Sequence, residues 1–341
     1  MRIWLNHWFS TAYRLIENAR EDLSVRFPDK KIEFIGTNAK RDCVYKLVCD
    51  EFYVEPEGLS EEQYIGWCLG FCISHKINIF VPRRNMVWVS KHLKEFEDRG
   101  IKVLVIKDYE LMNMLNDKFL TYSNVKNLPV PEHRCVNTVE EFKLAYEQLK
   151  TDDNRICIKY ARGEGATSFR VIDDRISGIE SLEFGNGAKM TYKDICDMLG
   201  SVERFDDLLV LPYLKGPEVS IDCLQTDKGL IAVPRIKEGR VTKLNFNAEM
   251  IMLANKFARD FKIEGPYNLQ LRWHKGIPYL LEVNTRMSGG SHMAYMVGIN
   301  FLALAIEQLV TGTISKSVED MTSDVAKETI ITQIETPLKL G

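Results

Sequence analysis

Residues 278–290 read Pro-Tyr-Leu-Leu-Glu-Val-Asn-Thr-Arg-Met-Ser-Gly-Gly and are the most informative stretch of a 341-residue chain. The apolar start of the stretch predicts a strand, and alternate residues of a strand point to the same side. Glu282, Asn284 and Arg286 therefore share one face. Carboxylate and amide oxygens beside a guanidinium group suit a magnesium ion that bridges nucleotide phosphates. The competing interpretation is an ordinary strand end whose polar residues lead into a loop.

The segment before this stretch supports the metal interpretation. Residues 267–273 also alternate between apolar and polar side chains, and a turn follows them. We expect a three-residue turn at residues 275–277, which would place Gln270 opposite Glu282 in the paired strand. Gln270, Glu282 and Asn284 would then form one oxygen-rich face beside an apolar layer. Such a face is costly unless a cation or a ligand satisfies it.

Residues 268–270 and 281–286 together resemble the metal-binding end of the ATP-grasp ligases. The resemblance runs from about Asn116 to about Gly312 and rests on several motifs in a fixed order. It implies that Arg286 steadies the acyl phosphate and the phosphoryl group in transfer. The implied ligands of two Mg²⁺ ions, or of Mn²⁺ in their place, are Gln270, Glu282 and Asn284.

Two lysines come in the order that the family shows. Lys118 lies at a predicted helix start, with Asn116 or Asp117 as the cap, and a solvated surface lysine is the competing interpretation. Lys159 interrupts an apolar, strand-like run, where a lysine usually has an anionic partner. The resemblance implies that both lysines bind the phosphates of ATP and that Lys159 also acts in catalysis.

A turn of small residues spans residues 161–171, where backbone amide groups can approach a phosphate closely. The turn is similar to the flexible phosphate-covering loop of the ATP-grasp lid. The nucleotide contacts that this similarity implies are Gly163, Gly165 and Ser168. The family usually has a proline after the lysine and more glycines. The residues that stand at those positions here are Tyr160, Ala166 and Ser168.

Residues 208–222 read as a buried strand, a Gly-Pro turn and a second strand. They resemble the hinge between the ATP-grasp lid and its larger half, where backbone groups read the adenine edge and a glutamate binds the ribose. The implied nucleotide contacts are Leu211, Pro212, Tyr213, Leu214 and Glu218. Many relatives have a glutamate where Leu211 stands, so adenine would rely here on backbone carbonyl groups. A solvated turn carboxylate is the competing interpretation of Glu218.

Residues 235–243 form a basic loop in a slightly acidic chain. Such a loop near the metal end could hold a carboxylate substrate or shield an acyl phosphate. A solvated run of charges explains the loop equally well. Arg235 is the candidate catalytic residue of this segment.

Residues 1–112 alternate between strand-like and helix-like segments, which predicts a doubly wound parallel sheet with helices on both faces. The expected strands are 1–5, 31–35, 51–54, 77–81 and 102–106, and the expected helices are 10–21 and 60–75. The first turn lacks the Gly-x-Gly-x-x-Gly dinucleotide signature. The region resembles the domain that precedes the ATP-grasp unit and usually contributes one wall of the acceptor site. Candidate substrate contacts at strand ends are Asn6, His7, Ser10, Asn38, Arg83 and Asn85, with helix capping as the competing role of Ser10.

Composition narrows the class of protein. A net charge of -3 and a pI near 6.1 argue against nonspecific nucleic-acid binding, which needs a concentrated basic surface. No stretch approaches the roughly 18 uncharged apolar residues of a membrane span, and no signal-peptide pattern is present. The eight cysteines lack paired Cys-x-x-Cys spacing. We therefore expect a cytoplasmic enzyme without a membrane partner, and an apolar N-terminal helix could support a homodimer.

The predicted architecture has three parts: a Rossmann-like pre-ATP-grasp domain at 1–112, an ATP-grasp small (lid) subdomain at 113–208, and a large subdomain with the metal site at 209–341. The implied function is an ATP-dependent ligase that converts a small carboxylate into an acyl phosphate, releases ADP and couples the acid to an amine. Residues 282–290 most resemble the carbamoyl-phosphate-synthetase-like carboxylate-amine ligases of biosynthetic or stress-associated operons. The alternatives are a noncatalytic ATP-binding regulator and an enzyme that phosphorylates bicarbonate. The sequence does not identify the acid or the amine.

Overall fold

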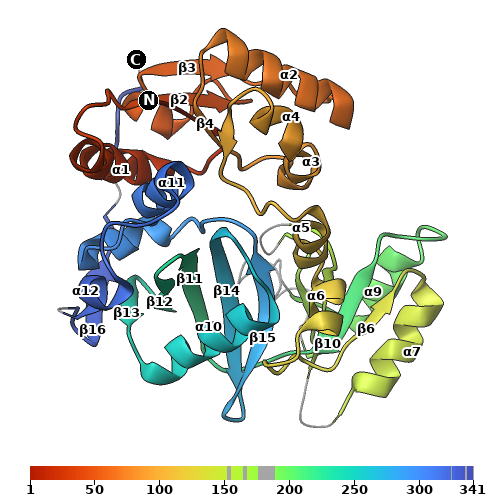
Figure 1. Cartoon of the computed structure of the whole chain (residues 1–341). Helices are drawn as coiled ribbons and strands as arrows, with labels where there is room; N and C mark the ends of the chain where they lie inside the picture. The colour runs from red at the N-terminus through yellow and green to blue at the C-terminus, as the bar shows by residue number, and fades with distance from the viewer. Residues whose placement is uncertain (152–154, 164–166, 176–188, 324, 335, 341) are drawn as a thin grey trace. The chain divides into compact units, whose positions relative to one another are not determined.

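The computed structural model describes residues 1–151, 155–163, 167–175, 189–323, 325–334 and 336–340 (Figure 1). The chain divides into two compact units. The first unit comprises Met1–Asn113, Val219–Gln270 and Val283–Gly341. The second unit comprises Met114–Glu218 and Leu271–Glu282. The three domain ranges expected from the sequence remain a prediction.

Five parallel strands in the order β3-β2-β1-β4-β5 form the N-terminal sheet of the first unit. The strands are β1 (Arg2–Asn6), β2 (Glu33–Asn38), β3 (Glu51–Val54), β4 (Ile79–Val81) and β5 (Lys102–Val103). Strands β2 and β3, which follow β1 in sequence, lie on one side of it, and β4 and β5 lie on the other side. Ligands of open α/β sheets bind beyond the carboxyl ends of the strands at such a reversal. We therefore expect any substrate contact of this sheet at the carboxyl ends of β1 and β4.

Helices pack on both faces of this sheet. Ile3 belongs to the core that includes the buried residues of α1 (Ala12–Arg26). Trp4 points to the opposite face, where its ring centroid lies 4.6 Å from that of Phe71 in α2 (Glu61–Ser74). Successive residues of one strand thus contact helices on opposite sides, as the period of a strand requires. The predicted doubly wound sheet is confirmed.

The predicted start of α2 agrees with the structure, whereas the predicted start of α1 does not. Ser60 caps α2 through a capping box with Gln63, close to the predicted start. Helix α1 begins at Ala12 rather than at Ser10, and its N-cap is Thr11, without a side-chain capping bond. Ser10 is exposed and does not cap the helix.

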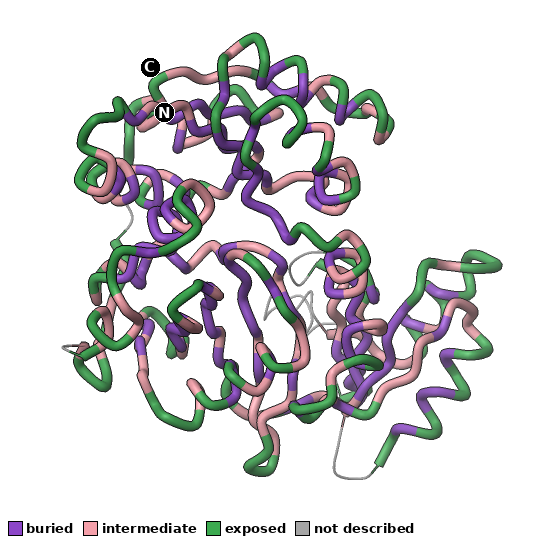
Figure 2. Tube along the Cα trace, in the orientation of Figure 1, coloured by how far each residue is buried: buried purple, intermediate pink, exposed green. Residues whose placement is uncertain are grey.

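A six-stranded sheet follows, with the order β15-β14-β11-β12-β13-β16. Its strands are β11 (Glu218–Thr226), β12 (Gly229–Glu238), β13 (Val241–Asn245), β14 (Gly265–His274), β15 (Ile277–Asn284) and β16 (Glu328–Thr332). Its helical neighbours along the chain are α10 (Ala248–Asp260), η2 (Ser291–Val297), α11 (Phe301–Thr311) and α12 (Val318–Thr322). Helix α11 is buried along most of its length (Figure 2) and shares one apolar core with α1, β11 and β12. This core joins the N-terminal segment of the first unit to its C-terminal segment.

The turn between β14 and β15 differs from the prediction. It has two residues, Lys275 and Gly276, and not three. Both have left-handed backbone angles, with φ values of 48° and 79°. Such a pair matches the primed two-residue turns whose twist fits a hairpin. The predicted three-residue turn is wrong, because the Lys-Gly pair can adopt the tighter geometry. The expectation that Gln270 lies opposite Glu282 was derived from the longer turn and loses that support.

The second unit contains a sheet with the order β6-β10-β7-β8-β9. Its strands are β6 (Arg134–Val136), β7 (Ile156–Tyr160), β8 (Arg170–Ile172), β9 (Lys189–Met190) and β10 (Leu208–Pro212). Its helices are α6 (Lys118–Asn124), α7 (Val139–Leu149) and α9 (Tyr192–Leu199), and α5 (Tyr109–Leu115) crosses the division between the units. Helices α7 and α9 cover one face of the sheet, and Tyr122 of α6 belongs to the apolar cluster on the other.

Within the described residues, no single helix is long and apolar enough to cross a bilayer. Helices η2 and α11 together have the required length and composition, but the pair is bent by 94°.

Candidate functional site

Lys118 and Glu282 form an ion pair in the second unit. The Lys118 Nζ lies 3.6 Å from the Glu282 Oε2 and donates to the Gly163 carbonyl oxygen at 3.0 Å. Asp117 fixes the start of α6, because its side chain accepts from the backbone amides of Phe119 and Leu120. Lys118 is only 8% exposed, so the predicted phosphate-binding lysine is not a solvated surface residue.

Lys159 lies on β7 and also contacts the strand that carries Glu282. Its Nζ donates to the Leu281 carbonyl oxygen at 2.8 Å and to the Tyr122 hydroxyl at 3.0 Å. The Tyr122 hydroxyl in turn donates to the same carbonyl oxygen at 2.6 Å. These bonds hold the ammonium group next to the end of β15. Tyr122 follows Lys118 by four residues on α6, and this helical spacing is the signal that could have revealed it.

Burial makes the charged forms of Lys118 and Lys159 less favourable than in water. Burial lowers the pKa of the Lys159 ammonium group from its ordinary value, and the negative charge of Glu282 opposes that shift. Burial likewise lowers the pKa of Lys118; Glu282 opposes the shift, and the positive charge of Lys159 adds to it. A bound polyanion would stabilise both ammonium groups in their charged form, since opposite charges nearby favour the charged state.

The predicted phosphate-covering loop is described in part. Gly163 has a φ of +118°, which favours glycine, and its carbonyl oxygen binds Lys118. The Ser168 hydroxyl accepts from the backbone amide of Tyr160 at 3.1 Å. Ser168 therefore ties β7 to the loop in this structure. Gly165 and Ala166 lie outside the described residues.

The predicted adenine-binding segment runs along the end of β10. Leu211 and Leu214 are buried, and the backbone amide of Tyr213 donates to the Arg155 carbonyl oxygen at 2.7 Å. Leu211 belongs to the same apolar cluster as Tyr122. Tyr122 of this cluster lies beside Lys159, whose Nζ is 5.5 Å from the centroid of the Tyr122 ring.

Glu218, the predicted ribose ligand, has a partner that sequence reasoning missed. Arg272 donates from Nη2 to the Glu218 carboxylate and from Nη1 to the Leu214 carbonyl oxygen at 3.4 Å. Arg272 lies two residues after Gln270 on β14, so strand alternation places the two side chains on one face. That alternation was the available signal. Glu218 is thus an exposed carboxylate, with 42% of its side chain accessible, that pairs with Arg272.

Gly216 allows this segment to approach β14 closely. A Cβ atom added at Gly216 would lie 1.9 Å from the Trp273 carbonyl oxygen. We expect Gly216→Ala to lower the free energy of unfolding by about 2–3 kcal/mol, because backbone atoms cannot yield as a side chain can. Urea denaturation measures this change. Gly70→Ala is the matched control: Gly70 is exposed on α2 with no atom near its added Cβ, so this variant should gain ~0.5–1 kcal/mol. Equal stability of the Gly216 variant and the parent chain would contradict the close approach.

Asn284 is oriented by a buried polar network in the first unit. Its Nδ2 donates to the Asn268 Oδ1 at 3.4 Å. Asn268 in turn donates from Nδ2 to Asp222 at 2.8 Å, and an ionised carboxylate can only accept. The network therefore fixes the orientation of the Asn284 amide group, with Nδ2 as the donor to Asn268. Its Oδ1 is then the atom that can bind a cation. Second-layer hydrogen bonds of this kind orient metal ligands.

Arg235 belongs to the same network. It donates from Nε to the Asp222 carboxylate at 2.6 Å and from Nη2 to the Ser288 hydroxyl at 2.7 Å. A Cβ added at Gly290 would lie 2.1 Å from the Arg235 Nη1, so the guanidinium group packs directly against the glycine turn. The Arg235 side chain is therefore fixed by Asp222, Ser288 and the glycine turn, and it is not part of a solvated run of charges. Residues 235–243 are not the predicted basic loop: Arg235 lies on β12, and a short turn at 239–240 leads into β13.

A family model described as "ATP-grasp in the biosynthetic pathway with Ter operon" matches residues 204–336. Solved structures named as a carboxylase, a synthetase and a ligase match over nearly the whole chain. The chain has an ATP-grasp fold. The resemblance seen in residues 268–286 is thereby confirmed at the level of the fold.

Three solved ATP-grasp structures illustrate the likeness. The biotin carboxylase domain of 2-oxoglutarate carboxylase from Hydrogenobacter thermophilus, solved with MgADP, ADP and bicarbonate, is 16% identical with a TM-score of 0.69 and covers 96% of this chain and 73% of that chain. An ADP complex of N5-carboxyaminoimidazole ribonucleotide synthetase is 11% identical with a TM-score of 0.68, with coverage of 97% and 81%. An L-amino acid ligase from Bacillus licheniformis is 17% identical with a TM-score of 0.64, with coverage of 91% and 74%. No match was found among curated proteins.

The residues predicted for the ATP-grasp site fall into two groups. Those in the second unit are Lys118, Lys159, Gly163, Ser168, Leu211, Pro212, Tyr213, Leu214, Glu218 and Glu282. Those in the first unit are Arg235, Gln270, Asn284 and Arg286. The contacts above join Lys118 and Lys159 to the end of β15 that carries Glu282, and they join Arg235 and Asn284 through the Asp222 network. The assignments of Gln270, Arg286 and Pro212 still depend on the sequence. Among the described residues, no three His, Cys, Asp or Glu side chains gather as a metal site. The predicted ligand set is one carboxylate and two amides.

The donor chemistry of this ligand set fits magnesium. Glu282 offers a carboxylate that is mostly buried and balanced by Lys118, and Asn284 offers an amide oxygen that the Asp222 network leaves as an acceptor. Magnesium prefers such oxygen ligands and commonly takes one or two carboxylates together with phosphate oxygens.

Proposed function

We propose that this chain is an ATP-dependent ligase that converts a carboxylate into an acyl phosphate, releases ADP, and joins the acid to an amine. The observation that carries the proposal is the gathering of Lys118, Lys159 and Glu282 at the end of β15. Two buried ammonium groups beside one carboxylate form a poor apolar core but a good site for a polyphosphate with a divalent cation. The ATP-grasp fold and the ADP complexes of similar structures support a nucleotide as that polyphosphate.

The side chains have distinct roles in this proposal. Lys118 and Lys159 bind the phosphate oxygens of ATP. Glu282, Gln270 and Asn284 hold the magnesium ions, which neutralise phosphate charge when bound. The hinge residues 211–214 contact adenine through backbone groups, and Glu218 exchanges its bond from Arg272 for the ribose hydroxyls.

The reaction requires charge neutralisation more than a protein nucleophile. A carboxylate oxygen of the acid attacks the γ-phosphorus, the bond from that phosphorus to the bridging oxygen breaks, and ADP leaves. The nitrogen of the amine then attacks the carbonyl carbon, and the bond to the phosphate oxygen breaks. Inorganic phosphate leaves, and the amine proton passes to phosphate or solvent. Arg286 and Arg235 bind the acid and the charge that develops on the transferred group.

The comparisons favour a biosynthetic ligase over the noncatalytic regulator. The description of the matched family model names a biosynthetic pathway. Similar structures carry the names of a carboxylase, a synthetase and a ligase. The carboxylate-amine ligase branch, the pair of magnesium ions and the homodimer are further parts of the proposal. A cytoplasmic location is also proposed.

Hydroxylamine provides a test that does not require the natural amine, because it traps acyl phosphates as hydroxamates. Purified chain is incubated with ATP, Mg²⁺, hydroxylamine and pools of carboxylic acids that include amino acids and bicarbonate. We expect ADP and a hydroxamate in equal amounts with at least one pool. AMP and pyrophosphate in place of ADP would contradict the acyl-phosphate route. Saturable ATP binding without acid-stimulated ADP release would favour the regulator.

A further inference from the structure

The loops after β1 and β4 carry strained backbone at the point where the strand order of the parallel sheet reverses. His7 follows β1 with a φ of 54°, and Asn85 lies four residues after the end of β4 with a φ of 52°. Left-handed backbone is uncommon outside glycine and is concentrated at ligand sites. Two such residues lie at the carboxyl ends of the two strands that flank the reversal, which is the edge where open α/β sheets bind ligands.

A single aromatic ring between these loops holds two cations. The Arg83 Cζ lies 4.3 Å from the centroid of the Phe9 ring, and the Arg286 Cζ lies 5.1 Å from the same centroid. Arg83 comes from the loop after β4, whereas Arg286 comes from the segment after β15. Guanidinium groups form paired, charge-assisted hydrogen bonds with carboxylates and phosphates, so two of them on one ring can contribute to an anion site.

The glycine turn after β15 places this ring beside the acid-binding residues. A Cβ added at Gly289 would lie 3.7 Å from the Phe9 ring, so the turn packs against Phe9. Arg235 packs against the next glycine of the same turn. The turn therefore contacts the Phe9 ring at Gly289 and Arg235 at Gly290.

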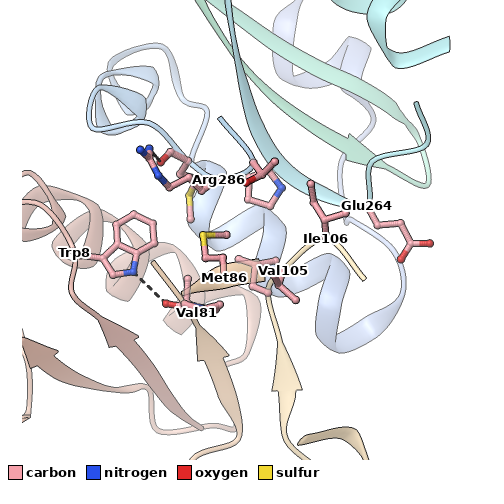
Figure 3. A pocket seen from close by; sticks show the side chains of 12 residues that line it. Trp8, Val81, Met86, Val105, Ile106, Glu264 and Arg286 are labelled. Carbon is pink, nitrogen blue, oxygen red and sulfur yellow. Dashed lines mark hydrogen bonds between the residues drawn. The ribbon is translucent and has the colours of Figure 1, made fainter. Parts of the chain in front are cut away.

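Figure 3 shows the apolar cavity next to Arg286. Its lining includes Trp8, Met86, Val105 and Ile106, with Arg286 and Glu264 at its opposite ends. Its volume is about 10 Å³, which has room for a single water at most. A substrate side chain therefore does not extend into this cavity.

We propose that Arg83 is a specificity-determining residue that binds a second anionic group of the acid substrate, either a carboxylate or a phosphate. This inference rests on the proposed function, in which Arg286 binds the carboxyl group that is activated. A guanidinium group forms paired hydrogen bonds with both kinds of anion, so the chemistry is shared. The substrate class is thus a dicarboxylic acid or a phosphorylated carboxylic acid.

Equilibrium binding to the full chain tests this inference. Isothermal titrations in the presence of MgADP use malonate, succinate, glutarate and adipate, each compared with the monocarboxylate of equal length, and two phosphorylated acids, phosphoglycolate and 3-phosphoglycerate. We expect at least one dianion to bind about tenfold or more tightly than its monoanionic match, as one additional charge-assisted contact provides. Which of the two dianion classes binds separates a carboxylate from a phosphate at Arg83.

Variants assign the effect to Arg83. We expect Arg83→Gln to reduce the affinity for the dianion to that for the monoanion, and Arg83→Lys to keep part of the preference. Lys30→Gln is the matched control, because Lys30 also stacks on an aromatic ring of the first unit, 5.4 Å from the centroid of Phe27. It should leave dianion binding unchanged. An unchanged unfolding temperature and unchanged MgATP affinity of Arg83→Gln would show that the variant is folded and that the nucleotide site is intact.

The outcomes separate this inference from the proposed function. Equal binding of dianions and monoanions, no dianion binding at all, or a full dianion preference in Arg83→Gln would each overturn the role of Arg83. Failure of the parent chain to bind MgATP would overturn the ligase proposal itself, whatever the anion titrations show.

Discussion

Replacing Glu282 with glutamine should reduce acid-stimulated ADP release by about a thousandfold, which corresponds to ~4 kcal/mol of transition-state stabilisation. Glutamine has nearly the same shape but lacks the negative charge that attracts a divalent cation. Lys118 would also lose its carboxylate partner at 3.6 Å while remaining buried. We therefore expect a higher Mg²⁺ concentration for half-maximal activity, in addition to the lower rate. A coupled assay for ADP across a magnesium titration measures both quantities.

Glu132→Gln is the control for this experiment. Glu132 lies in the same unit and also pairs with a cation, Arg134 at 3.3 Å, but its side chain is 64% exposed. This variant should retain the activity and the magnesium dependence of the parent chain. Parental activity in Glu282→Gln would show that the carboxylate does not bind metal and would remove the main support for the ligase proposal.

Replacing Lys159 with methionine should lower ADP formation by about a hundredfold, the typical effect of removing one group that stabilises developing charge. Methionine keeps most of the volume of the side chain but cannot bind phosphate. The fold should survive, because the Leu281 carbonyl oxygen keeps its bond from the Tyr122 hydroxyl at 2.6 Å. The loss of a buried ammonium group with a lowered pKa also removes a desolvation cost. Steady-state kinetics and thermal unfolding of the same sample test both statements.

Lys193→Met provides the comparison in the same unit. Lys193 is 82% exposed and pairs with Asp197 on the surface of α9, so its removal should not change catalysis. A loss of activity in Lys159→Met that is accompanied by unfolding would indicate a structural role. A fully active and folded variant would contradict phosphate binding by Lys159.

Local patterns in the sequence were sufficient for the fold of the N-terminal sheet. Strand β3 has the predicted bounds, and Ser60 marks the start of α2 because its capping box involves only neighbouring residues. The order of residue types from Lys118 to Arg286 was also sufficient for the ATP-grasp fold. These signals depend on contacts close in sequence or on motifs whose order is fixed.

Contacts distant in sequence were not predictable in the same way. The pair of Arg272 with Glu218 joins residues 54 positions apart, and Asn268 lies 46 positions from Asp222. Nothing in either segment alone requires its partner. The two-residue turn at Lys275 was misjudged because a lysine rarely adopts left-handed backbone, although the following glycine permitted the tighter geometry. The position of Phe9 between two arginines depends on the packing of loops from separate parts of the chain.

Manganese is the most direct probe of the central claim that Glu282, Gln270 and Asn284 bind the metal of an ATP complex. A crystal grown with Mn²⁺ and a nonhydrolysable ATP analogue gives an anomalous signal at each metal position. We predict Mn²⁺ bound by the carboxylate of Glu282, the side-chain oxygens of Gln270 and Asn284, and the phosphates. Manganese at other side chains, or the nucleotide bound without metal at these three residues, would contradict the account.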